Sequence, residues 1–359
     1  MVAETNKKPR VLWIDIARGL AILMVIIGHS QMNYYGDYWT RLLFSVHLPI
    51  FFVLSGYLYR PKAYRQELKG GWFNLILPYL ATVVIGGALI IIARLIPNAY
   101  ILPYRIFSLK SLLFSGLYGV NETVKIAKLS IIGIGAIWFL LAFFLGIQIF
   151  NLVMKLNIPD WGKGLISIVC TVSGISISQW VYLPWSLDSA LFAQIFFFSG
   201  YLIKKSTIMT KLSWWMVVIL SGIYLYSGTQ GTLVVADVRD DTMLIGVVAG
   251  ITNSLFLMWF SQKIEEIGKR LNIKWILTWL AFMGAESLTI LCFHLIDLDY
   301  LHVWVHVYGL VYGHAGQLMA TYAVIIYRIV FTIIMTLIIR NLPIFRSLYM
   351  HRRYPFIKR

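Results

Sequence analysis

The first apolar segment of the chain carries three ionisable residues, Asp15, Arg18 and His29. Arg18 and His29 are three helical turns apart. Eleven helical steps of about 100° return to within roughly 20° of the same face, about 16 Å further along the axis. Asp15 lies about one turn before Arg18, near that face. Ionisable residues inside a membrane helix usually face a protein interior or a watery path, so this stripe is a candidate site for chemistry.

A second histidine, His47, opens the next apolar segment at the depth expected for His29. Imidazole titrates near neutral pH, so two histidines at one level suit proton transfer. The structural alternative is that Asp15 and Arg18 form an ion pair that snorkels toward the membrane surface, while His29 caps the helix end. Taken alone, His47 fits a functional role and a structural role equally well.

The composition is that of a polytopic membrane protein. Hydrophobic residues make up 59% of the chain and charged residues 13%, whereas soluble domains are about 45–50% apolar and about 25% charged. The basic, apolar amino terminus lacks a small-residue cleavage site and predicts a retained first span. Cys170 and Cys292 form no disulfide framework or metal motif. We therefore expect an all-α membrane domain over residues 1–359, with no appended soluble domain.

The hydropathy pattern predicts ten spans with both termini in the cytoplasm. In that topology 22 of the 31 Lys and Arg lie inside and seven outside, when Arg94, Lys155 and Arg340 at the span ends are counted with the adjacent loops, while Arg18 and Arg328 lie within spans. This is the positive-inside bias. The net charge of +16 therefore serves topology and anionic membrane lipid and does not indicate nucleic-acid binding. The expected spans are approximately 11–29, 42–59, 72–96, 136–155, 164–181, 187–203, 213–227, 243–262, 275–296 and 319–340.

Two of the expected outer loops are unusual. Residues 97–135 form a long, locally basic loop, which favours a lid or a substrate-binding element that folds back. Residues 297–317 are predicted to be a loop rich in Asp, His, Tyr and Trp without Lys or Arg. His302 and His306 would share a helical face, but zinc would need a third ligand, so we expect interfacial histidines and no metal.

A short motif occurs twice, in residues 51–58 and 196–202, which share Phe-Phe and Ser-Gly-Tyr-Leu. It indicates either a remnant of duplication or close helix packing at small residues, with Tyr at the membrane interface.

Residues 13–30 and 44–58 resemble acyltransferase family 3, integral membrane O-acyltransferases that modify carbohydrates, and are most similar to the branch with fucose 4-O-acetylases. The family pattern of Arg or Lys, ten residues and His maps onto Arg18 and His29, and its second histidine onto His47. The Phe-Phe-x-x-Ser-Gly motif maps onto Phe51, Phe52, Ser55 and Gly56, and later matches are Leu77-Pro-Tyr79, Ile137-Trp-Phe-Leu140 and His294.

The resemblance departs from the family pattern on the cytoplasmic side. Many relatives carry paired arginines just before Leu-Pro-Tyr, where this chain has Gly71 and Asn74. Arg60 and Arg65 lie nearby and are candidates to bind donor phosphates in their place.

The resemblance implies transfer of acetyl from cytoplasmic acetyl-CoA, without a metal, to a sugar hydroxyl of a cell-surface or lipid-linked polysaccharide at a bacterial plasma membrane. In this scheme Arg18, held by Asp15, meets the donor. His29 either deprotonates the hydroxyl or carries the acetyl group, and His47 orients His29 or shuttles its proton.

Four later polar residues, Glu286, Ser287, His294 and Arg328, fall within the last two expected spans. Either they line the cavity of the candidate site, or they are buried and hydrogen-bond to one another between helices. Ser287 and His294, seven residues apart, would share a helical face. Buried Arg328 needs a carboxylate or a donor phosphate. The rival class is a transporter or flippase of acyl groups or glycolipid, which intramembrane charge also suits; a non-catalytic scaffold would leave the polar residues unexplained.

Overall fold

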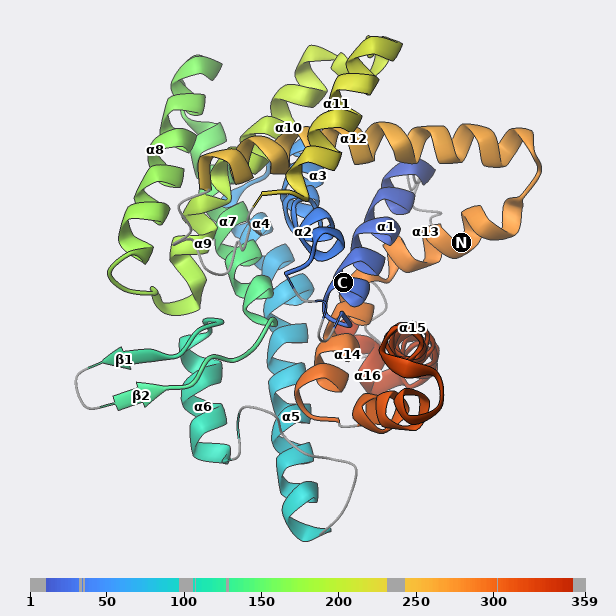
Figure 1. Ribbon diagram of the computed structural model, residues 1–359. Helices are drawn as coiled ribbons and strands as arrows, with labels where there is room; N and C mark the ends of the chain where they lie inside the picture. Colours follow the sequence, from blue (N-terminus) through green and yellow to red (C-terminus); the bar gives the residue numbers. More distant parts are fainter. Residues whose placement is uncertain are drawn as a thin grey trace, which may run out of the picture.

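The computed structural model describes residues 11–31, 34, 36–96, 106, 108–126, 129–230, 243–301 and 303–350. Within this part the chain is predominantly helical, with one antiparallel two-stranded hairpin (Figure 1). The predicted all-α class is therefore confirmed as predominantly helical, and the hairpin departs from it. His302 lies outside the described residues.

Most of the described chain folds into α-helices, which alternate with short π- and 3₁₀-helical turns. In chain order the elements are α1 Leu12–Gly28, α2 Tyr38–Phe44, α3 Pro49–Tyr57, α4 Tyr64–Gly71, the π-helix η2 Trp72–Ile76, α5 Leu77–Leu95, α6 Leu109–Tyr118, β1 Val124–Ile126, β2 Leu129–Ile131, α7 Trp138–Lys155, α8 Asp160–Ser178, η3 Pro184–Ser186, α9 Leu187–Phe192, α10 Gln194–Ser206, η4 Ile208–Thr210, α11 Trp214–Ser227, α12 Met243–Arg270, α13 Lys274–Ala285, α14 Ser287–Asp299, α15 Val303–Asn341 and α16 Pro343–Tyr349.

Six helical stretches in the described part are long and apolar enough to cross a membrane, or up to eight if each bent helix pair is one span. The bent pairs are η3–α9 with α10, at 43°, and α13 with α14, at 72°. Two predicted spans correspond to helices of 17 residues (α1) and 14 residues (α11), shorter than the roughly 20 residues that usually span a bilayer. The chain is thus a multi-pass membrane protein.

The predicted outer loop over residues 297–317 is wrong where the structure describes it. Helix α14 continues to Asp299, and α15 begins at Val303. The sequence from Val303 to residue 315 lacks proline and is rich in apolar residues, so the helix persists until Gly316, whose φ of 78° breaks it. The expected span 275–296 is likewise two helices that meet at Glu286.

The expected outer loop over residues 97–135 is partly folded. Where it is described it holds helix α6, which lies beside α5, and the β1–β2 hairpin, which lies beside α6 in Figure 1.

The repeated motif forms a close helix crossing between α3 and α10. A Cβ on Gly56 would lie 1.8 Å from the carbonyl oxygen of Phe197, and one on Gly200 would lie 1.9 Å from that of Val53. Each glycine therefore meets the partner backbone directly, which supports the packing interpretation of the repeat.

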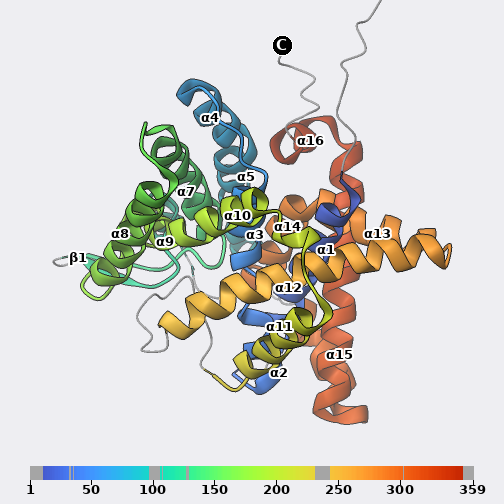
Figure 2. The ribbon, with the colours of Figure 1, turned by 90° about the horizontal axis from the view of Figure 1, so that it is seen from above.

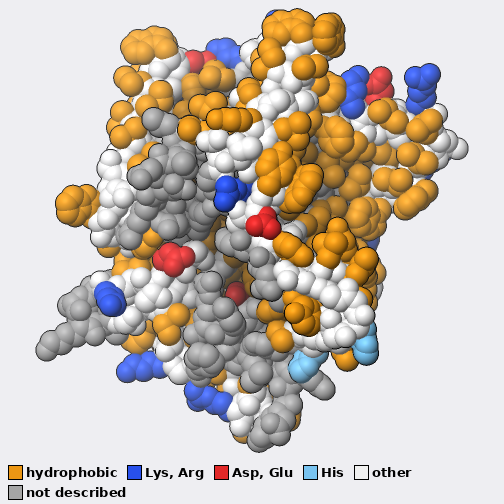
Figure 3. All heavy atoms as spheres, viewed as in Figure 1, with side chains coloured by type: hydrophobic (Ala, Val, Ile, Leu, Met, Phe, Trp, Pro, Cys, Tyr) orange, Lys and Arg blue, Asp and Glu red, His pale blue; other side chains and the backbone are white. Residues whose placement is uncertain are grey.

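The surface is largely apolar, and hydrophobic side chains cover the region of α12 and α13 in Figure 3. Three exposed tryptophans stand at the first or second residue of their helices: Trp161 of α8, Trp214 of α11 and Trp275 of α13 are 75%, 79% and 72% exposed. Tryptophan at helix ends is typical of membrane–water interfaces.

Candidate active site

The end of α1 brings His29 against a histidine from the far end of the chain. His29 Nδ1 lies 3.2 Å from His294 Nε2, and the rings stack with centroids 5.4 Å apart. His294 is fully buried. One nitrogen must donate and the other accept, so one proton lies between the two rings. A general base at Nε2 of His29 would require Nδ1 of His29 to be the donor in this contact.

His47 is buried on the other side of an aromatic ring. Its Nδ1 lies 3.1 Å from the carbonyl oxygen of Phe44. A carbonyl only accepts, so Nδ1 carries the proton and Nε2 of the neutral ring is an acceptor. His47 stacks on the Phe44 ring at 4.5 Å, and that ring lies 6.0 Å from the His29 ring. Phe44 therefore links the two histidines, whereas His294 meets His29 directly.

Arg328 of α15 binds the carboxyl end of α1. Its Nη1 donates to the His29 carbonyl oxygen at 2.8 Å and to Ser30 Oγ at 3.2 Å. The last carbonyls of a helix lack partners within it and carry partial negative charge, so a cation here satisfies both needs. Arg328 thus positions the backbone that carries the His29 ring.

The partner of Arg328 is Asp297 of α14. Arg328 Nε lies 3.2 Å from Asp297 Oδ2, and both side chains are 0% exposed. Tyr327 donates its hydroxyl to Asp297 Oδ1 at 2.9 Å, and the guanidinium stands 4.8 Å over the ring of Trp304. Asp297 falls in the predicted loop, so the sequence-based prediction misses this ion pair. The spacing of three residues between His294 and Asp297 would have indicated that both lie on one helix.

The predicted Asp15–Arg18 pair is present but loose. The Arg18 Nη1 to Asp15 Oδ1 distance is 4.0 Å, and the side chains are 35% and 11% exposed. Gly284 packs so closely that a Cβ there would lie 1.7 Å from the Asp15 carbonyl oxygen. The bend at Glu286 and Ser287 therefore lies beside this part of α1, about two turns before His294.

The other predicted donor residues lie away from His29. Arg60 and Arg65 are exposed, before and within α4, and α4 is well separated from α1 in Figures 1 and 2. Ser55 precedes Gly56 at the α3–α10 crossing. In the described part of the chain, no three His, Cys, Asp or Glu residues gather as a metal site.

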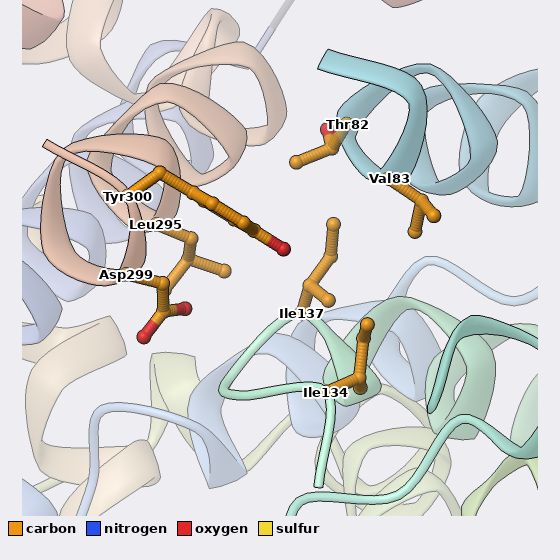
Figure 4. Close-up of a pocket in the computed structure, with 7 residues that line it drawn as sticks. All are labelled: Thr82, Val83, Ile134, Ile137, Leu295, Asp299 and Tyr300. Atoms are coloured by element: carbon orange, nitrogen blue, oxygen red, sulfur yellow. The ribbon is translucent and has the colours of Figure 1, made fainter. Parts of the chain in front are cut away.

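A small hollow lies beside α14, between α5 and the segment that leads into α7 (Figure 4). Its volume of about 10 Å³ suits a single water molecule. The residues that line it are Thr82, Val83, Ile134, Ile137, Leu295, Asp299 and Tyr300.

Comparison with known proteins gives one match. The family model of acyltransferase family 3, described as an acyltransferase domain, matches residues 11–340. No curated protein and no solved structure matches the chain.

Proposed function

The chain belongs to acyltransferase family 3, and from this membership we propose that it is a membrane O-acetyltransferase. In this proposal it moves acetyl from cytoplasmic acetyl-CoA to a hydroxyl of a cell-surface or lipid-linked polysaccharide, at a bacterial plasma membrane, as in the branch with fucose 4-O-acetylases. The carrying observation is the contact of His29 with His294 at a helix end bound by Arg328.

The proposed chemistry is general-base transfer to the acceptor. His29 Nε2 takes the proton of the sugar hydroxyl as its oxygen attacks the thioester carbonyl carbon. The C–O bond forms, the C–S bond breaks, and the coenzyme thiolate leaves with the proton that His29 returns. In this mechanism Nδ1 of His29 donates to Nε2 of His294, so the lone pair that acts as the base is on Nε2 of His29. His47 supports the site through Phe44.

The topology in this proposal has ten spans and both termini in the cytoplasm. The 22 to 7 distribution of Lys and Arg supports it. The exposed tryptophans Trp161, Trp214 and Trp275 mark the starts of three helices as interface positions, which this topology puts at the cytoplasmic face. Acetyl-CoA then meets the basic inner face, and Arg18, about three turns before His29, lies on the path of the acetyl group.

Thioester cleavage tests the proposal and separates it from a carrier. Purified protein in lipid nanodiscs receives acetyl-CoA with a panel of sugars and glycolipids, and free thiol and acetylated product are measured together. We expect one thiol per acetyl ester formed. A transporter or flippase would move a substrate without releasing thiol.

The matched variants are His29→Gln at the site and His306→Gln at an exposed position of α15. General-base catalysis contributes about 10²–10⁴-fold, so we expect a loss of that size for His29→Gln alone. Equal turnover of the two variants, both correctly folded, would refute the assignment of His29.

A further inference from the structure

Helix α7 carries a buried amide that nothing in the described part of the chain satisfies. Gln148 is 6% exposed, and neither its Nε2 nor its Oε1 has a hydrogen-bond partner there. The side chain points at the end of α4, because its Nε2 lies 3.2 Å from where a Cβ on Gly71 would stand. A buried amide without partners costs about 1–3 kcal/mol per group.

The next polar residue on this side of α7 shows the contrast. Asn151, one turn later, accepts from the Tyr59 hydroxyl at 2.9 Å and donates to the Lys62 carbonyl oxygen at 3.4 Å. The fold therefore satisfies one amide and leaves Gln148 open. In the adjoining π-helix η2, Asn74 also has a buried Oδ1 without a partner among the described residues. π-helical turns frequently mark functional sites.

The chemistry of these groups selects the ligand. An amide both donates and accepts but carries no charge, so it pairs with another amide better than with a phosphate. The helix that ends beside Gln148 carries cations: Arg65 and Lys69 of α4 are exposed, and Lys62 just before α4 pairs with Glu67 at 2.8 Å. A ligand with amides at one end and phosphates at the other would match this order of groups.

We propose that Gln148 and Asn74 bind the amides of the pantetheine arm of the acyl donor, while the cations of α4 face its phosphates. The proposal rests on the proposed function. Gly71 keeps the site tight, because a Cβ there would lie 2.7 Å from the Phe144 ring.

Two donors separate the amide subsite from the phosphate subsite. Acetyl-CoA has both the arm and the phosphates, whereas S-acetylpantetheine has the arm alone. For Gln148→Leu and Asn74→Leu we expect KM to rise about tenfold for both donors, which is about 1.4 kcal/mol. For Arg65→Met we expect KM to rise for acetyl-CoA only. Gln179→Leu, the same chemical change at an exposed position, is the control.

The outcomes are distinct. If Gln148→Leu and its closer isostere Gln148→Met keep the wild-type KM for both donors, the amides are structural and the inference is overturned. A rise for acetyl-CoA but not for S-acetylpantetheine also overturns it, since that would indicate a phosphate contact. If wild-type protein neither binds desulfo-CoA nor releases thiol from acetyl-CoA, the proposed function itself fails, and this inference with it.

Discussion

Breaking the Asp297–Arg328 ion pair should separate the stability of the protein from its activity. Both side chains are fully buried, and removing one partner of such a pair typically costs about 3–5 kcal/mol, because the other charge stays buried alone. Asp297→Leu should therefore lower the thermal unfolding midpoint strongly. Asp160→Asn, at the exposed pair with Lys205, should cost at most about 1 kcal/mol.

Replacing the whole ion-pair network with apolar groups should restore most of the stability. The triple variant Asp297→Leu, Arg328→Met and Tyr327→Phe removes both charges and the Tyr327 hydroxyl, which donates a hydrogen bond to Asp297. Such replacements of buried pairs are often neutral or stabilising. The His29 carbonyl and Ser30 still lose their donor, which costs about 1–3 kcal/mol, so we expect a midpoint between those of Asp297→Leu and the wild type.

Activity should not recover with stability. Arg328 holds the backbone of His29 at 2.8 Å, and a misplacement of about 1 Å near a reacting group costs roughly 10²-fold in rate. The assay is kcat and KM for acetyl-CoA, with unfolding followed in the same detergent. A triple variant that is stable and retains kcat within about threefold would refute the positioning role and leave Arg328 a structural residue.

The remaining predictions concern the other contacts of the site and the topology. His294→Gln should lower kcat by about 10–10²-fold, less than loss of His29, because an amide can still engage the His29 ring; kcat below that of a His29 variant would reverse the assignment. Arg18→Gln should weaken acetyl-CoA binding, and an active double variant with Asp15→Asn and unchanged donor affinity would show a merely structural pair. Gly200→Val should unfold the protein, since a Cβ there meets backbone at 1.9 Å, and a thermal scan decides it. A cysteine at Lys205 should resist membrane-impermeant labelling from outside intact cells; labelling would overturn the proposed topology.

The sequence predicts local features of the site well. The periodicity predicts Arg18 and His29 on one helix; the observed helix Leu12–Gly28 lies within the predicted span 11–29 and has His29 as its C-cap residue. The Asp15–Arg18 contact also follows from spacing alone. Each of these features depends on residues within three helical turns, where helix geometry fixes the distances.

The long-range contacts could not be read from the chain. His29 and His294 are 265 positions apart, and hydropathy ranks helices by apolarity without pairing them. Treating residues 275–296 as one straight span also removed the 72° bend. The predicted straight span ends with its apolar residues at 296. Asp297, the carboxylate that pairs with Arg328, therefore falls in the predicted loop that follows.

The bend and the ion pair act together on α1. Before the bend, Gly284 of α13 packs against the backbone of Asp15. This contact fixes the position of α13 along α1 near Arg18. After the bend, α14 carries His294, which contacts the His29 ring, and Asp297, which pairs with Arg328. One broken element thus contacts α1 at both ends of its ionisable stripe. A straight α13–α14 would keep the first contact and carry the others away along its axis, so the break at Glu286 is the feature on which the histidine pair depends.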